Sequence, residues 1–182
     1  MRFLFVAASL ALAHIARAEF VCENPTTLST TTAGANGEVE VEYLRCSNAD
    51  SIRAQSQVLR FEKRQIDVCG APCATNCFSG SPGTGPVPGD CTVIADALLY
   101  DSQNVGALFT LDPAANTTVI TMKYQSCDTF IVNQAGVPLQ YCRTAWSELV
   151  NDLAQGCQAA QNAHGGNCVA NDQRWFVQVQ HS

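Results

Sequence analysis

The ten cysteines of this 182-residue chain constrain its fold more than any other feature of the sequence. An even number of cysteines is typical of proteins that fold in an oxidising compartment, where every thiol can be paired. We therefore expect five disulfides and no free thiol. Eight cysteines alone permit about 105 pairings, so the sequence leaves the connectivity open. The ten positions are Cys22, Cys46, Cys69, Cys73, Cys77, Cys91, Cys127, Cys142, Cys157 and Cys168.

A zinc site is the competing interpretation of so many cysteines. Structural zinc needs paired Cys-x2-Cys or Cys/His spacings, whereas Cys69, Cys73 and Cys77 are spaced by four and have no histidine near them. The Gly- and Pro-rich stretch 80–89 lacks the lysine of a phosphate-binding loop. We expect neither a metal site nor a cofactor.

The N-terminus has the layout of a cleavable signal peptide. Arg2 gives a positive start, residues 3–13 are apolar, and Ala16-Arg17-Ala18 is a small-x-small cleavage pattern. We predict that residues 1–18 are removed after Ala18 and that the protein is secreted and extracellular. No later stretch approaches the roughly 20 apolar residues of a membrane-spanning helix. No transmembrane anchor is therefore expected.

Lys63-Arg64 is the only adjacent basic pair, and it lies where the composition changes. It has the form of a dibasic convertase site, although two solvated charges would look the same. We predict that residues 19–64 are a pro-segment and that residues 65–182 are the mature disulfide-rich α/β domain. Within the pro-segment, the hydroxyl-rich run 26–32 is expected to be O-glycosylated or disordered, and the alternating residues 39–43 predict a short strand.

The charge of the chain makes nucleic acid an unexpected partner. Residues 65–182 hold nine Asp and Glu residues against three Lys and Arg residues, a difference of −6 that equals the formal charge of the whole chain. Phosphate backbones are bound by clustered Lys and Arg. An acidic domain of this kind should repel both nucleic acid and anionic lipid.

Apolar periodicity in residues 65–182 predicts an alternation of strands and helices. Cys142, Trp146, Val150, Leu153 and Cys157 share one face of a long helix. The two cysteines would be about 22 Å apart along it and cannot bond to each other. The remaining predicted elements are a strand over 66–78, a helix from its cap Asp90 to Gly106, a hairpin of 107–111 with 118–124 whose extended region continues at 130–132, and a strand over 175–179.

These elements follow one another in the order β-α-β-β-α-β. We therefore predict an α+β fold, a disulfide-stapled two-layer sandwich with the split βαβ (ferredoxin-like) order and an N-terminal pro-segment. In the presumed hairpin turn, Asn116-Thr117-Thr118 is a glycosylation sequon, and we expect a glycan on Asn116.

Catalytic residues are hard to find in the sequence. Beyond the signal peptide the histidines are His164 and His181, and we expect His164 with Gly165-Gly166 to end the second helix. Carboxylates of the glycosidase type are available, but most lie off the apolar stripes where solvated charges are usual, so we predict no catalytic residue. The candidates are Asp90, Asp96, Asp101, Glu148 and Asp152.

Aromatic side chains could instead stack on a sugar ring. Trp146 and Trp175 fall on the predicted apolar faces, so we expect both in the core. The aromatic residues that remain as candidates for an exposed platform are Tyr100, Tyr124, Tyr141 and Phe176.

Four short stretches carry a resemblance to a known class of proteins: Gly89-Asp90-Cys91, Tyr141-Cys142, Gly165-Gly166-Asn167-Cys168 and Arg174-Trp175-Phe176-Val177. With the signal peptide and the Lys-Arg junction, this arrangement resembles small secreted cysteine-rich proteins of fungi, including killer toxins and killer-toxin-like effectors. The resemblance implies a toxin-like or effector-like protein that acts on other cells.

The class of function follows from the resemblance and the composition together. The acidic domain has no spare apolar stripe for membranes, so we favour a non-catalytic protein that binds an extracellular, cell-wall or host-surface component, such as a wall glycan or a host protein. Two alternatives stay open. One is a small secreted hydrolase that uses carboxylates, and the other is a structural or developmental matrix protein.

Overall fold

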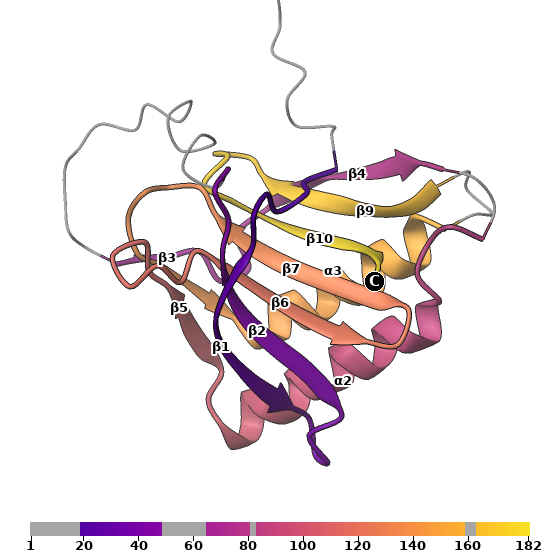
Figure 1. Ribbon diagram of the computed structural model, residues 1–182, viewed down its shortest axis with the longest axis horizontal. Coiled ribbons are helices and arrows are strands. Elements are labelled where there is room, and N and C mark those ends of the chain that lie inside the picture. The colour runs from indigo at the N-terminus through magenta and orange to yellow at the C-terminus, as the bar shows by residue number, and fades with distance from the viewer. Residues whose placement is uncertain (1–18, 49–64, 81–82, 159–162) are drawn as a thin grey trace, which may run out of the picture.

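The computed structural model describes residues 19–48, 65–80, 83–158 and 163–182. Within these residues the chain forms a mostly-sheet α+β domain with two helices and five disulfides. Figure 1 shows both helices on the same side of a large twisted sheet. Ala18, Lys63 and Arg64 lie outside the described residues, so signal cleavage and dibasic processing stay predictions.

The large sheet has seven strands, and every neighbouring pair in it is antiparallel. Its order is β1-β2-β6-β7-β10-β9-β4. The bounds are β1 Thr26–Ala33, β2 Val39–Arg45, β4 Cys73–Ser79, β6 Val119–Tyr124, β7 Cys127–Asn133, β9 Ala163–Ala170 and β10 Trp175–His181. A smaller sheet, in the order β3-β8-β5, contains β3 Ile66–Asp67, β5 Leu108–Leu111 and β8 Leu139–Cys142.

The predicted split βαβ order is not confirmed. A βαβ unit joins parallel strands through a helix, but β4, the strand of the large sheet that precedes the first helix, lies at the sheet edge and pairs antiparallel with β9. In the described residues, the only parallel pair is β3 with β8, in the small sheet. The α+β class holds, while the topology is an antiparallel sheet covered on one side.

The N-terminal residues contribute two strands to the large sheet. The predicted strand around 39–43 is confirmed as β2, which pairs with β6. Of the two alternatives for the hydroxyl-rich run, disorder is wrong, because the run forms β1, paired with β2 from Thr26 to Ala33. O-glycosylation stays a prediction. Threonine favours strands because its branched side chain suits a pleated surface, and the exposed outer position of β1 leaves its hydroxyl groups in water.

The predicted hairpin of 107–111 with 118–124 is wrong. β5 pairs with β8 in the small sheet, and β6 pairs with β7 through a turn at Gln125 and Ser126. A single bridge between Asp112 and Thr117 is what remains of the expected pairing. The ring centroid of Phe109 in β5 lies 6.1 Å from that of Tyr141 in β8, so an aromatic contact between distant segments stabilises the pairing of these strands.

The two helices are α2, Pro88–Asn104, and α3, Arg143–Gly156. The predicted second helix is confirmed, because Cys142 and Cys157 are the residues that flank α3. The first helix starts earlier than predicted: Val87 is its N-cap and a proline occupies the first turn, as prolines often do. Asp90 therefore is not the cap, and its carboxylate instead accepts hydrogen bonds from the N–H and O–H of Ser126 at 3.1 and 2.6 Å.

Gly165 and Gly166 do not end a helix, contrary to the prediction. They lie inside β9, between β10 and β4. A Cβ on Gly165, whose φ is +103°, would lie 2.3 Å from the carbonyl oxygen of Val179, and one on Gly166 would lie 2.6 Å from that of Asn76. The pair is needed because neighbouring backbones approach closely. His164 is accordingly a strand residue and not a helix cap.

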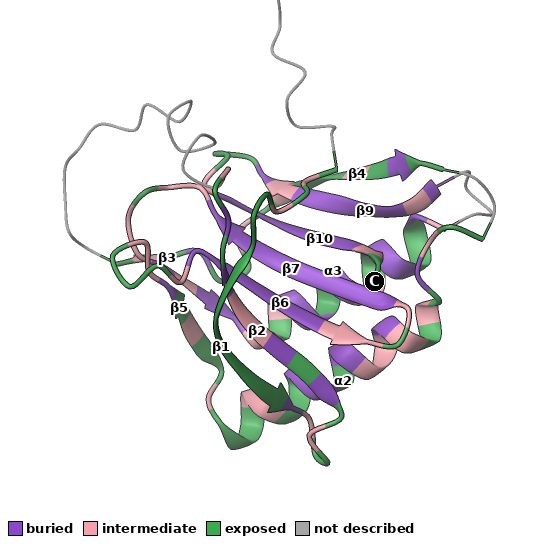
Figure 2. Cartoon of the chain, in the orientation of Figure 1, coloured by how far each residue is buried: buried purple, intermediate pink, exposed green. Residues whose placement is uncertain are grey.

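Buried residues run along the central strands of the large sheet (Figure 2), and they form two clusters. The main core lies under the helices and contains Trp146 and Trp175, which are 2% and 1% exposed, as predicted. A second cluster lies on the opposite face, which we call the open face. Its buried residues are Leu44, Cys46, Val119, Phe130, Val132 and Phe176, and Phe20 packs against them.

All ten cysteines lie in described residues and form five disulfides with no free thiol, as predicted. One bridge lies within residues 19–48 and four lie within residues 65–182, so no disulfide crosses between these two parts. The cysteines that flank α3 bond to the segments containing β3 and β4. The pairs are Cys22–Cys46, Cys69–Cys142, Cys73–Cys168, Cys77–Cys157 and Cys91–Cys127.

Candidate functional site

Polar side chains gather at one end of the open face. Successive residues of a strand point to opposite faces, so each of four strands sends alternate residues to this side. The antiparallel register sets Glu42 of β2 opposite Thr121 of β6. It also sets Asp128 of β7 between Lys123 of β6 and Gln180 of β10. Four strands thus bring five polar side chains together.

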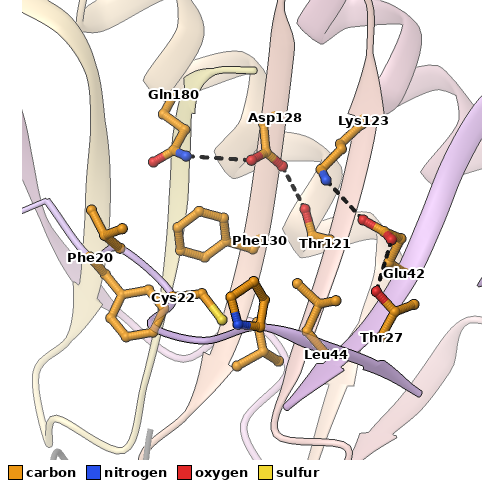
Figure 3. Close-up of a pocket in the computed structure, with 13 residues that line it drawn as sticks. Phe20, Cys22, Thr27, Glu42, Leu44, Thr121, Lys123, Asp128, Phe130 and Gln180 are labelled. Carbon is orange, nitrogen blue, oxygen red and sulfur yellow. Dashed lines mark hydrogen bonds and ion pairs between the residues drawn. The ribbon is translucent and has the colours of Figure 1, made fainter. Parts of the chain in front are cut away.

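A pocket of about 420 Å³ lies over these residues (Figure 3). Its floor comes from the strands, and part of its wall comes from the N-terminal segment before β1. The lining residues are Phe20, Val21, Cys22, Pro25, Thr27, Glu42, Leu44, Val119, Thr121, Lys123, Asp128, Phe130 and Gln180. The volume falls in the range of small-molecule sites, about 300–1,000 Å³.

Two short hydrogen-bonded chains cross the pocket. Around Asp128, the hydroxyl of Thr121 donates to Oδ1 at 2.5 Å and the amide of Gln180 donates to Oδ2 at 3.4 Å. Around Glu42, Lys123 Nζ donates to Oε2 at 2.8 Å and the hydroxyl of Thr27 donates to Oε1 at 3.2 Å. Both carboxylates are therefore held in fixed orientations.

The pKa values of Asp128 and Glu42 are shifted in opposite directions. Burial raises the pKa of Asp128, and the hydrogen bond from Thr121 and the charge of Lys123 only partly offset it. The hydrogen bond from Lys123 holds the pKa of Glu42 below its usual value. Burial lowers the pKa of Lys123, but Glu42 and the neighbouring carboxylates outweigh it and leave that pKa raised. The Lys123–Glu42 pair is thus charged at neutral pH.

An aromatic anchor holds the N-terminal wall of the pocket. The ring of Phe20 meets those of Phe130 and Phe176 edge-on, with centroids 5.7 and 5.5 Å apart. Gln178, which is fully buried, accepts a hydrogen bond from the Phe20 N–H at 3.0 Å and donates one to its carbonyl at 3.1 Å. The wall is therefore attached to the sheet through both packing and hydrogen bonds.

The carboxylates considered from the sequence do not form this site. Asp90 bonds to Ser126, and Asp101 Oδ1 accepts a hydrogen bond from the Gly34 N–H at 3.3 Å. The other three are exposed on the helices, and none of the five lines the pocket. The exposed three are Asp96, Glu148 and Asp152.

The two histidines and the aromatic candidates are also dispersed. His164 Nε2 lies 3.5 Å from the carboxylate of Glu19, and His181 is exposed near the C-terminus. Tyr141 and Phe176 are buried, and burial raises the pKa of Tyr141 well above its usual value. Tyr100 is 41% exposed on α2, away from the pocket.

One sequence pattern could have pointed to the residues that do form the site. Polar residues alternate with apolar ones through 119–124 and again through 177–180, which indicates strands with one polar face. The sequence does not indicate that these two strands flank β7 in one sheet or that β2 adds its own polar face to theirs. That information comes only from the pairing of distant strands.

Scans against protein-family models and against curated proteins find no match to this chain. Among the helices that the structure describes, none is long and apolar enough to cross a membrane. In residues 19–48, 65–80, 83–158 and 163–182, no group of three or more His, Cys, Asp or Glu side chains is arranged to hold a metal ion.

Proposed function

We propose that this protein is a secreted, non-catalytic binding protein, toxin-like or effector-like, whose open-face pocket takes a neutral glycan of a cell wall or host surface. One observation carries the proposal: fixed polar groups of both kinds, donors and acceptors, lie beside an aromatic wall in one pocket. Binding pockets typically combine an apolar lining with a few well-placed polar groups. The five disulfides support an extracellular location.

A sugar ring presents hydroxyl groups that donate and accept, and C–H faces that are apolar. Lys123 has three N–H donors, and the structure gives one of them a partner among the described residues. The carboxylates of Glu42 and Asp128 each keep lone pairs for further donors. Phe20 and Phe130 supply apolar surface for a ring face.

The charge of the pocket favours a neutral ligand over an anionic one. Glu42 and Asp128 bring two acidic groups against the single cation Lys123, and the chain as a whole has a formal charge of −6. The negative potential of these charges should repel an acidic polysaccharide or a phosphate group. Neutral β-glucan, chitin and mannan are the wall polymers that fit this chemistry.

The proposal is tested by calorimetric titration with short soluble oligosaccharides of β-glucan, chitin and mannan. For the oligosaccharide that binds, Lys123→Met should weaken affinity at least tenfold, about 1.4 kcal/mol, because it removes the central donor. Arg174→Met is the matched control, since Arg174 pairs with Asp172 and does not line the pocket. Absence of binding by all three oligosaccharides, or an equal loss in both variants, would contradict the proposal.

A carboxylate hydrolase is the second candidate, and the opposite pKa shifts of Asp128 and Glu42 favour it. Glycosidases pair a carboxyl group that keeps its proton as acid with a second one that is ionised. This function predicts release of new reducing ends, lost in both Asp128→Asn and Glu42→Gln while binding persists. In the described structure Glu42 is already paired with Lys123, which favours binding over nucleophilic attack.

A further inference from the structure

The pocket is built from two parts of the chain that no disulfide joins. Residues 19–48 supply Phe20, Glu42 and neighbouring wall residues, and residues 65–182 supply Lys123, Asp128 and the rest of the floor. One bridge, Cys22–Cys46, closes the first part on itself, and the other four close the second. Each part is therefore cross-linked by disulfides only within itself.

The contacts between the two parts resemble those of an interface between subunits. β2 pairs with β6 over five residues, from Glu40 opposite Lys123 to Leu44 opposite Val119. The Lys123–Glu42 ion pair and the two Gln178–Phe20 hydrogen bonds also cross the boundary. Backbone pairing and a buried aromatic anchor are the contacts by which added strands commonly bind to a sheet edge.

Loss of residues 19–48 would leave unfavourable surface on the remainder. The edge of β6 would lose its backbone partners, and unpaired strand edges promote association with other chains. Val119, Phe130 and Phe176, now at most 6% exposed, would lose the cover of Phe20 and Leu44. Hydrophobic burial therefore favours the docked state even without a covalent connection.

We propose that residues 19–48 are a separable subunit, so that a cut between the two parts, such as that predicted at Lys63-Arg64, yields a non-covalent two-chain protein with a pocket shared across its interface. A ligand that contacts both chains binds only the docked state and so stabilises it by mass action. The effect of the ligand rests on the proposed glycan-binding function, whereas the two-chain association does not.

The test starts from the full chain with a recognition sequence for a highly specific protease placed at residues 55–61. After cleavage, native mass spectrometry and gel filtration at about 10 μM should give a single 1:1 species, as expected for a dissociation constant well below about 1 μM. Separation of the N-terminal chain from the remainder at that concentration would overturn the proposal.

Variants of the cut protein test whether the described interface holds it together. Phe20→Ala should raise the dissociation constant of the two chains at least tenfold, because the aromatic anchor is lost. Leu28→Ala is the matched control, since Leu28 is 45% exposed on β1 and lies outside both the pocket and the apolar cluster. Equal dissociation constants for the two variants would contradict the proposed interface.

The ligand is tested last, with the oligosaccharide that binds the uncut protein in calorimetry. Its addition should lower the dissociation constant of the two chains, because it binds only the docked state. An oligosaccharide that binds without changing chain association would overturn the shared pocket alone. If no oligosaccharide binds, the proposed function fails while the two-chain result stands independently.

Discussion

Gln178 in β10 holds both backbone groups of Phe20, a residue 158 positions earlier in the chain. The amide oxygen accepts the Phe20 N–H at 3.0 Å, and the amide nitrogen donates to the Phe20 carbonyl at 3.1 Å. The backbone of Gln178 pairs with β7 and β9, and its side chain binds the backbone of Phe20 as a neighbouring strand would. The pair fixes one wall of the pocket.

Gln178→Ala should therefore destabilise the attachment of the N-terminal segment. It removes both hydrogen bonds to the half-buried backbone of Phe20, and at about 0.5–1.5 kcal/mol for each bond the cost is about 1–3 kcal/mol. Urea unfolding measures the loss, and hydrogen exchange should accelerate at residues 20–22. Gln103→Ala, on the exposed side of α2, is the control and should stay within about 0.5 kcal/mol of the parent. Equal stability of the two variants would exclude the role given to Gln178.

The raised pKa of Asp128 predicts a specific pH dependence of stability. Between the unfolded carboxyl pKa of about 3.9 and the raised folded pKa, the folded state binds more protons than the unfolded state, so the free energy of unfolding falls as pH rises. Asp128→Asn should remove that fall and be the more stable protein at neutral pH. Urea titrations at a series of pH values, followed by tryptophan fluorescence, check it.

Glu42→Gln provides the opposite control for Asp128. Because the folded pKa of Glu42 is lowered, its stabilising contribution is present above the unfolded pKa of about 4.3 and is lost as pH falls through the folded pKa. Replacing Glu42 should therefore lower the free energy of unfolding at neutral pH. It should also reduce the dependence of that free energy on pH in the acid range only. The same pH profile for both variants would contradict the assignment of opposite shifts.

The disulfides should differ in their contributions to stability. In the chain-entropy model, Cys22–Cys46, with a separation of 24 residues, contributes about 3.5 kcal/mol, and Cys73–Cys168, with a separation of 95, contributes about 4.7 kcal/mol. Paired Cys→Ala variants followed by guanidinium unfolding should give losses in that order. A larger loss for the Cys22–Cys46 pair would mean that strain or residual structure dominates.

The sequon at Asn116 predicts an N-glycan on the exposed turn between β5 and β6. Asn116 has a φ of +58°, which aspartate tolerates, so Asn116→Asp should remove the glycan without disturbing the turn. Intact mass after expression in a eukaryotic secretory host measures the change. Thr118→Ser keeps the sequon and should keep the glycan. An unglycosylated parent protein would disprove the prediction.

The parts of the fold that the sequence predicts are those governed by local periodicity. The apolar stripe from Cys142 to Cys157 predicts α3, and the alternation after Trp175 predicts β10. Burial of one face requires apolar residues at the period of a helix in the first case and of a strand in the second. The even number of cysteines also predicts that every cysteine forms a disulfide, although it does not predict which cysteines are bonded to each other. None of these inferences requires knowledge of which segments are neighbours.

The parts that could not be predicted depend on contacts between distant residues. The Gly165-Gly166 pair reads as a helix end, but the close approach of Val179 and Asn76 requires it inside a strand. Likewise, nothing local shows that Glu42, in a presumed pro-segment, meets Lys123 across a strand boundary. The pocket cannot be predicted for the same reason, since strand order decides which polar faces join.

The disulfides also differ in how far they lie from water. Cys91 and Cys127 are both fully buried, whereas Cys69, Cys73 and Cys77 are exposed or half-buried. An attacking thiolate must reach a sulfur atom, so glutathione would open the bridges around β4 first. In a reducing cytosol the protein would loosen from its β4 edge inwards. The Cys91–Cys127 bridge between α2 and β7 would be the last to be reduced.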